Sequence, residues 1–346
     1  MKKFFKSIGI FSLLLLTAVP AKAEVSYTVA DLGNFQPMAI NARGDVTGFS
    51  TSGVFHAVVY RNGTLSDLGT LGGNESYAFD INDQGDIVGF SKIADGTSRA
   101  FLYSNGTMMN LGALDYTTSS AYGINNSGQI VGRLSKVGES SAFLYSNGLM
   151  NDLGNIGLGI DINESGQMVL SAGHAFLYSA GSMIDLGTLG GQTSSPRAIN
   201  SSGQIVGWSN ITGDATSHAF LYSDGQMTDL DGSLNELNSS AWDINDNGQA
   251  VGLWAGDLAF LYSNGEMHDL NTMVDPDLNL SLDIAVAINN NGQILALGVW
   301  NNSPSSVFLL TPIPEPSTVI LIGCVAAFST RKMAYVGLRK IAKIGR

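Results

Sequence analysis

The chain of 346 residues contains a single cysteine, Cys324, in an apolar run near its C-terminus, so no disulfide can form within the chain. Charged residues are scarce at 13 %. Basic residues are especially few between Glu24 and Pro312, where seven of them face 28 acidic ones and give a net charge of −21. Such a surface repels a phosphate backbone, so we expect no nucleic-acid partner.

Sequence signatures of catalysis are also sparse. Three of the four histidines occupy one repeated position and the fourth, His268, lies in a predicted strand. A Gly-x-Ser-x-Gly elbow, a phosphate loop and a His-Glu-x-x-His motif are all missing. We therefore expect no enzyme, no catalytic residues and no cofactor. Many acidic residues are present, so a carboxylate pair of a glycosidase or lyase stays open as an alternative.

The sequence repeats a turn of the form Asn-x-x-Gly seven times, at successive spacings of 41, 43, 38, 37, 45 and 44 residues. The asparagine side chain can bond its own backbone to begin a turn, and glycine accepts the positive φ that ends it. The seven copies begin at Asn41, Asn82, Asn125, Asn163, Asn200, Asn245 and Asn289.

Each repeat unit contains four short apolar segments separated by Asn, Ser, Asp and Gly, which is typical of strands in a meander. The first segment precedes the turn and the second, such as Gln204–Trp208, follows it. The third has the form Ala-Phe-Leu-Tyr, as at Ala219–Tyr222, and a two-residue turn such as Asn105-Gly106 predicts a hairpin to the fourth. The fourth segment ends in Asp-Leu, as at Asp229-Leu230.

This pattern predicts an all-β protein, a seven-bladed β-propeller with four-stranded blades over residues 24–312. The last repeat lacks a fourth strand after Val307–Leu310, whereas Tyr27–Gly33 ends in Asp-Leu-Gly with no strand before it. We expect Tyr27–Leu32 to pair antiparallel with Val307–Leu310, so that the N-terminal strand closes the ring and covers its edge.

The N-terminal segment, residues 1–23, is predicted to be a secretory signal peptide. Lys2, Lys3 and Lys6 precede an apolar run that ends in Ala21-Lys22-Ala23. Ala21 and Ala23 are the small residues expected at the cleavage site.

The C-terminal segment, residues 313–346, resembles the PEP-CTERM sorting signal. It contains Pro314, Glu315 and Pro316, then an apolar run Val319–Phe328, then Arg331 and Lys332. The resemblance implies processing by an exosortase, a transpeptidase-like membrane enzyme of Gram-negative bacteria that make exopolysaccharide. A plain C-terminal membrane anchor is the alternative interpretation.

The repeat units resemble the HAF repeat, a bacterial extracellular repeat named for His-Ala-Phe. The triplet occurs at His174–Phe176 and His218–Phe220, with a near copy at His56–Val58. The resemblance implies an extracellular repeat protein but no particular activity.

Ligand-binding candidates come from the residue that ends each second strand. The side chains there that suit stacking on sugar rings, or binding beside them, are Phe49, Phe90, Arg133 and Trp208. The alternative is that these aromatic residues pack between blades. The segments Thr51–Phe55 and Ser209–Ser217 are predicted to be variable loops at the same end of the blades.

Three of the seven turns resemble a calcium loop, because Asp80, Asp161 and Asp243 stand two residues before the asparagine. The acidic residue expected at the twelfth position of such a loop is replaced by Ser91, Ala172 and Trp254. We therefore interpret these segments as hairpin turns and predict no metal site, with weak calcium binding left open.

Together these features predict a secreted, cell-surface-held repeat propeller that acts as a non-catalytic binding module in the exopolysaccharide or cell-envelope layer. Its expected partners are the exosortase, a polysaccharide or another surface protein, and the membrane through the C-terminal segment before processing. The alternatives are a propeller hydrolase or lyase that acts on extracellular glycan, and a structural spacer without a ligand.

Overall fold

The computed structural model describes residues 27–232, 237–301 and 303–314. The predicted signal peptide with Ala21 and Ala23 lies outside the described residues, as do Glu315, Pro316, Arg331 and Lys332 of the predicted sorting signal. Pro314 is the last described residue and is exposed. Among the described residues, no helix has both the length and the apolar character needed to cross a membrane.

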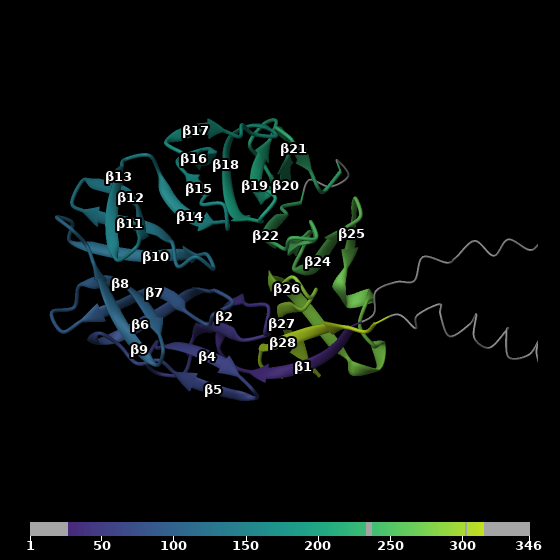
Figure 1. Cartoon of the computed structure of the whole chain (residues 1–346). Coiled ribbons are helices and arrows are strands. Elements are labelled where there is room, and N and C mark those ends of the chain that lie inside the picture. The colour runs from purple at the N-terminus through teal and green to yellow at the C-terminus, as the bar shows by residue number, and fades with distance from the viewer. Residues whose placement is uncertain (1–26, 233–236, 302, 315–346) are drawn as a thin grey trace, which may run out of the picture. The chain divides into compact units, whose positions relative to one another are not determined.

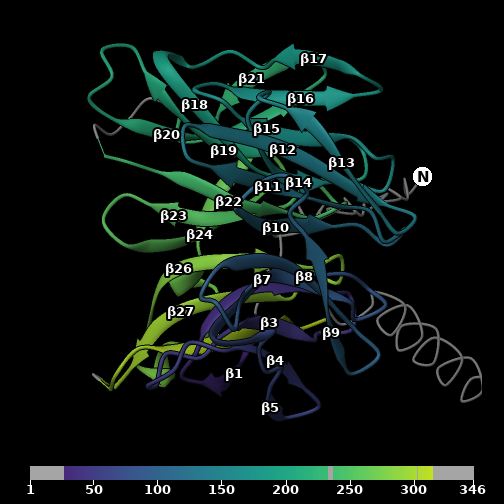
Figure 2. The ribbon, with the colours of Figure 1, turned by 90° about the vertical axis from the view of Figure 1, so that its left-hand side faces the viewer.

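Residues 26–313 form one compact unit of seven four-stranded antiparallel sheets arranged in a ring. This is the predicted seven-bladed β-propeller (Figure 1). In each sheet the strands follow chain order outward from the central channel, apart from the last blade. Seen from the side, the strands run between the two faces of the ring (Figure 2).

The first three blades span residues 36–154 and share the predicted order of four strands. Blade 1 consists of β2 (Gln36–Ile40), β3 (Val46–Phe49), β4 (Ala57–Arg61) and β5 (Thr64–Asp67). Blade 2 consists of β6 (Gly72–Ile81), β7 (Ile87–Ile93), β8 (Ser98–Ser104) and β9 (Thr107–Gly112). Blade 3 consists of β10 (Thr118–Ile124), β11 (Ile130–Lys136), β12 (Glu139–Ser146) and β13 (Leu149–Gly154).

Blades 4 to 6 repeat this order. Blade 4 consists of β14 (Leu158–Ile162), β15 (Met168–Ser171), β16 (Ala175–Ser179) and β17 (Ser182–Asp185). Blade 5 consists of β18 (Gly190–Ile199), β19 (Ile205–Ile211), β20 (Ser217–Ser223) and β21 (Gln226–Asp229). Blade 6 consists of β22 (Ser240–Ile244), β23 (Ala250–Trp254), β24 (Leu258–Ser263) and β25 (Glu266–Asp269).

Blade 7 joins the two ends of the described chain, as predicted. It contains β26 (Leu280–Ile288), β27 (Ile294–Trp300), β28 (Ser306–Pro312) and, as its outermost strand, β1 (Tyr27–Gly33). Strand β1 pairs antiparallel with β28, so that Val29 faces Leu310 and Asp31 faces Phe308. In Figure 1 the purple β1 lies beside the yellow β28. Two 3₁₀ turns, η1 (Leu270–Thr272) and η2 (Pro276–Leu278), connect blades 6 and 7.

The repeated Ala-Phe pair is explained by packing between neighbouring blades. The phenylalanine is fully buried in five blades and contacts the blade before it; Phe101 of blade 2, for example, packs with Ala57 and Val59 of blade 1. Small residues are needed where the first and second strands cross closely. A Cβ on Gly132 would lie 2.1 Å from the carbonyl oxygen of Ser120, so only glycine fits there.

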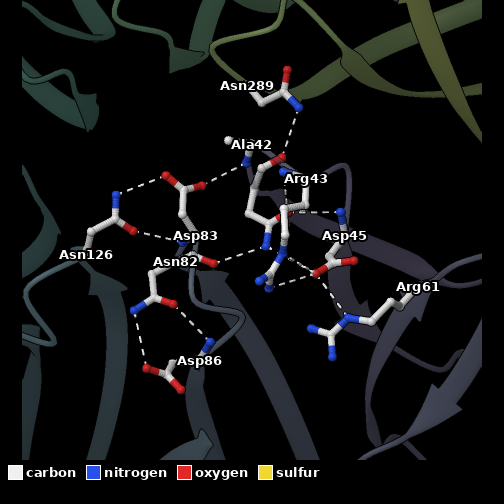
Figure 3. A network of polar contacts seen from close by, with 10 residues as sticks. Ala42, Arg43, Asp45, Arg61, Asn82, Asp83, Asp86, Asn126 and Asn289 are labelled. Carbon is white, nitrogen blue, oxygen red and sulfur yellow. Dashed lines mark hydrogen bonds and ion pairs between the residues drawn. The ribbon is translucent and has the colours of Figure 1, made fainter.

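The seven Asn-x-x-Gly turns form as predicted, and they also connect the blades. In blade 5 the Oδ1 of Asn200 accepts hydrogen bonds from the backbone N–H groups of Ser202 and Gln204, and Gly203 has φ of 81°. The Nδ2 of each asparagine donates to the backbone carbonyl of the corresponding asparagine in the next blade. The seven N–O distances lie between 2.9 and 3.3 Å, and the bond from Asn289 to Asn41 closes the circle (Figure 3).

Deleting residues 24–33 removes β1 and should strongly destabilise the propeller. Tyr27 and Leu32 are buried, and burying each such side chain contributes about 1.5–3 kcal/mol, to which the lost strand pairing adds. We expect a large fall in the midpoint of urea unfolding, together with aggregation through the uncovered β28. Shortening the exposed loop at Thr51–Gly53 is the control and should change the midpoint little; equal effects of the two deletions would contradict the closure.

Candidate functional site

The ring has two different faces. The seven Asn-x-x-Gly turns and the hairpins between third and fourth strands lie at one end of the strands, called here the turn face. The loops between second and third strands and the links between blades lie at the other end, called here the loop face.

The channel is lined by the ends of the seven first strands and holds two cavities. A cavity of about 170 Å³ lies at the turn face among the seven asparagines and the seven isoleucines that precede them. A second cavity, of about 230 Å³, lies further toward the loop face. It is lined by the residue three positions before each asparagine, by the residue two positions before it in five blades, and by Ile40 and Ile288. The same few repeat positions of the seven blades therefore form the inner wall of the channel.

Three carboxylates face the second cavity: Asp80, Asp161 and Asp243, from alternate blades. Each belongs to a first strand rather than to the turn that follows it. Each also joins its blade to the next one. Asp80 Oδ2 accepts from the backbone N–H of Ile124 at 2.8 Å, and the corresponding bonds of Asp161 and Asp243 go to Ile199 and Ile288.

Burial in the channel changes the titration of these carboxylates. It raises the pKa of Asp80 to about 6 and that of Asp243 to about 7, although two backbone N–H donors favour the charged form of each. Burial, and next the charge of Asp80, raise the pKa of Asp161 well above its usual value. All three carboxylates are therefore easier to protonate than an ordinary aspartate, and Asp80 and Asp243 gain protons near neutral pH.

In the three calcium-like loops the acidic side chains are not arranged around one point as they are in a calcium loop. The first Asp of each loop uses both oxygens on backbone N–H groups, as Asp80 does with Ile81 and Ile124. Within residues 27–232, 237–301 and 303–314, no group of three or more His, Cys, Asp or Glu side chains is placed to hold a metal ion.

The loop-face layer of the second cavity is chemically mixed. Phe79, Tyr122 and Trp242 bring aromatic rings to it, and Arg197 brings one positive charge. The guanidinium of Arg197 lies 5.3 Å from the ring centre of Trp242 and makes no ion pair or hydrogen bond with the described residues. Burial lowers the pKa of Arg197, as expected for a cation moved away from water.

A continuous line of six aromatic rings leads from the loop face into this cavity. We call it the aromatic strip; its members, each partly exposed or exposed, are Phe55, Phe49, Tyr77, Phe90, Phe79 and Tyr122. The Tyr77 ring stacks on Phe55 and on Phe90, with centre separations of 5.8 and 4.8 Å. Phe79 then connects Phe90 to Tyr122 at 5.8 and 5.4 Å.

The structure brings together two of the four predicted ligand-binding residues. Phe49 and Phe90 both contact Tyr77, so they belong to one aromatic surface across the seam of blades 1 and 2. Arg133 lies in blade 3 and donates from Nε to Ser140 Oγ at 2.9 Å, and Trp208 lies in blade 5 opposite Ser195 and Ala219. All four occupy equivalent places in the register, each facing the alanine of its third strand.

One predicted loop is shorter than expected. Ser209 to Ile211 extend β19, and the loop of blade 5 covers only residues 212–216. In this extension Ser209 pairs with His218 and Asn210 with Ser217, and the buried Ser209 hydroxyl accepts a hydrogen bond from the N–H of Leu189. The predicted loop Thr51–Phe55 is a loop, with Phe55 at 41 % exposure.

The repeated histidine has a partner that the sequence did not indicate. His56, His174 and His218 each approach, through Nδ1, the Asp that ends the fourth strand of the same blade, at 2.7 to 2.9 Å. In blade 3 Ser141 donates to Asp152 at the same place. The pair joins the beginning of the third strand to the end of the outer strand, which links the His-Ala-Phe and Asp-Leu motifs of the repeat.

The raised pKa values predict a pH dependence of stability. An Asp that is easier to protonate when folded favours folding below its ordinary pKa, and this contribution is lost as pH rises from about 4 to about 7. D243N removes one such group, so the free energy of unfolding should fall less over that range than in the unchanged protein. Urea unfolding at several pH values measures this.

D224N is the control for this pH dependence, because Asp224 lies in an exposed hairpin turn where other repeats have asparagine. Its profile should match that of the unchanged protein. An unaltered profile for D243N would show that Asp243 is not protonated preferentially in the folded state.

No model of a known protein family matches the chain, and no curated protein is similar to it in sequence. Several solved structures are similar in fold at 11 % identity. A puromycin-hydrolysing peptidase of Mycobacterium tuberculosis has a TM-score of 0.55, over 82 % of this chain and 52 % of the peptidase. YCF48 bound to D1 peptide has a TM-score of 0.50, over 86 % of this chain and 99 % of YCF48.

TolB from Acinetobacter baumannii has a TM-score of 0.46, over 78 % of this chain and 63 % of TolB. The chain thus spans about half of the peptidase and less than two thirds of TolB. Enzymes and proteins of other kinds both appear among these neighbours, so they leave open whether this chain is an enzyme. The peptidase and YCF48 agree with the β-propeller fold of the chain.

Proposed function

We propose that this chain is a non-catalytic propeller that binds carbohydrate through the aromatic strip on its loop face. The observation that carries the proposal is the continuity of six aromatic rings from Phe55 to Tyr122, which ends at the wall of the second cavity. Sugar rings have an apolar C–H face that packs on an aromatic ring, and rigid rings lose little conformational entropy on binding.

The strip differs from the core in two respects. The core phenylalanines, such as Phe101 and Phe143, occur at one repeat position and are fully buried. The strip draws its rings from several strands and from one loop of blades 1 to 3, and each ring keeps some exposure. Its length suits several consecutive sugars better than a single one, which favours a polysaccharide over a free sugar.

The setting of the protein is part of the same proposal. The predicted signal peptide at residues 1–23 and the PEP-CTERM-like segment at 313–346 support secretion, recognition by an exosortase and retention in the exopolysaccharide or cell-envelope layer. A polysaccharide of that layer is then the most direct ligand. A surface protein that binds the same strip is the alternative partner.

A glycan hydrolase or lyase is the second candidate, because Asp80, Asp161 and Asp243 lie in a cavity and have raised pKa values. The hydrogen bonds of these groups favour a structural role instead. Each carboxylate holds two backbone N–H groups, one of them in the next blade. We therefore assign them to closing the ring and propose no reaction.

F55A tests the proposed binding surface. Phe55 is exposed in a loop, so its removal should leave the unfolding midpoint nearly unchanged while it weakens glycan binding about tenfold, a loss of about 1.4 kcal/mol. A glycan array identifies the ligand, and calorimetry with that ligand measures the change. L149A is the control, because Leu149 is an apolar residue of the outer strand β13 with 68 % exposure.

Three outcomes separate the candidates. Loss of binding in F55A with retained binding in L149A supports the proposal. Turnover of a polysaccharide that D161N abolishes would replace it with the enzyme. No binding to any glycan on the array would contradict it and favour a spacer or a protein partner.

A further inference from the structure

Two arginines of blade 1 converge on the turn of blade 2 at the turn face. Arg43 belongs to the turn after β2, and Arg61 is the last residue of β4. A Cβ placed on Gly85 would lie 2.4 Å from Arg43 Nη2 and 2.8 Å from Arg61 Nη2, so both guanidinium groups cover the same glycine. Figure 3 shows the two side chains on either side of Asp45.

The two guanidinium groups share a single carboxylate oxygen. Arg43 Nη2 and Arg61 Nε lie 3.1 and 3.0 Å from Asp45 Oδ2. The Asp45 side chain is 9 % exposed, whereas those of Arg43 and Arg61 are 51 % and 42 % exposed. One carboxylate therefore faces two cations, and several N–H donors of the pair point to solvent.

The other six blades show that the ring does not need these arginines. At the position of Arg43 they have Gln84, Ser127, Ser165, Ser202, Asn247 and Asn291. At the position of Arg61 they have Ser104, Ser146, Ser179, Ser223, Ser263 and Thr311. Every one of those seams closes with the same asparagine bond and without a cation.

A need to neutralise the charge of Asp45 does not explain the presence of Arg43 and Arg61 either. Blades 3 to 7 have glutamine at this position, and in all five its amide lies over the glycine of the next turn, as Gln129 does over Gly166. Blade 2 has Asp86 there, and no arginine accompanies it. Asp86 bonds Asn82 Nδ2 at 3.5 Å and forms no ion pair with a described residue. A carboxylate at this position is thus tolerated alone.

We propose that Arg43 and Arg61 form a binding site for an anionic oxygen group, a phosphate, sulfate or carboxylate, which bridges the two guanidinium groups over Gly85. Paired arginines suit such groups, because the planar fork of N–H donors matches their oxygens. Asp45 orients the two arginines through its ion pairs with both of them. The neighbouring Asp83 uses its oxygens on Ala42 N and Asn126 Nδ2, as Figure 3 shows, so it turns toward its own hydrogen bonds.

This site is independent of the proposed carbohydrate surface, because the two lie at opposite ends of the strands. The anionic group could belong to a free ion or to an acidic sugar of a polysaccharide. Failure of either binding test leaves the other result unaffected, since F55A changes only the loop face and the arginines lie only at the turn face.

The test uses full-length protein labelled with ¹⁵N-arginine and titrated separately with inorganic phosphate and with an oligogalacturonide. The guanidinium signals of Arg43 and Arg61 should shift with saturation, while those of Arg133 should not, because Arg133 lies in β11 of blade 3 and not at the turn of Gly85. Saturation by phosphate alone indicates a free ion, and saturation by the oligogalacturonide indicates an acidic sugar. No saturable shift with either probe, or equal shifts of all arginine signals, overturns the proposal.

Variants separate binding from structure. R43S/D45Q/R61S replaces all three residues by those that other repeats use, so it should fold like the unchanged protein and lose at least tenfold in affinity. D45Q should keep both arginines and bind more tightly, because the competing carboxylate is gone. K92Q/K136Q removes two charges that pair with Glu75 and Glu139 elsewhere and should keep its affinity. Unchanged affinity in the triple variant, or an equal loss in the lysine variant, refutes the site.

Discussion

Seven asparagine amides, each donating to a backbone carbonyl of the next blade, set the geometry on which the rest of the propeller depends. All seven residues are buried, and the series runs from Asn41 through each blade and returns from Asn289. A buried carbonyl without a partner costs about 1–3 kcal/mol, so each asparagine both begins its own turn and satisfies its neighbour. The circle is complete only when all seven blades are present. The pairing of β1 with β28 adds a closure at the outer edge of blade 7, without any disulfide.

Repeated and unrepeated positions have different roles in the molecule. Repeated positions build the ring: the asparagines, the isoleucines before them, the core phenylalanines and the histidine–aspartate pairs. The unrepeated residues face the channel or solvent. The aromatic strip on the loop face and the arginine pair on the turn face both occur at the seam of blades 1 and 2. Because the same hydrogen bonds hold every pair of neighbouring blades, single residues between two blades can differ from the repeat without loss of the fold. Binding surfaces can arise at such places.

The sequence predicted the period, the blade count, the turns and the closing strand, because these follow from local patterns and from counting strands. It could not show which atom the asparagine Nδ2 bonds, because the partner lies 37 to 45 residues away in six blades and 248 residues away in the seventh. The Asn-x-x-Gly pattern itself is explained by the turn alone. Phe49 and Phe90 were found because the register repeats. Tyr77, Phe79 and Tyr122 were missed, because the first strands were interpreted only as apolar segments.

The contacts of Asp80, Asp161 and Asp243 also could not be predicted from the sequence alone. The spacing of these residues resembles that of a calcium loop. In the structure each one follows a register shift in its first strand, such as that between Ala78 and Asp80, and bonds the next blade. The pairing of residues across a bulge depends on the backbone of two strands and not on one motif. Similarly, the extension of β19 to Ile211 depends on pairing with Gly190 and with β20, which lie in other segments of the chain.

The most direct test of the asparagine ring is the free energy of urea unfolding of N200D. Aspartate keeps the shape and the acceptor oxygen of Asn200 but loses the donor to the carbonyl of Asn245 and to Gln204 Oε1. N105D is the matched control, because Asn105 lies in an exposed hairpin turn and the same turn in blade 5 has Asp224. The ring predicts a loss of about 2–4 kcal/mol for N200D and less than about 0.5 kcal/mol for N105D. Equal stabilities of the two variants would contradict it.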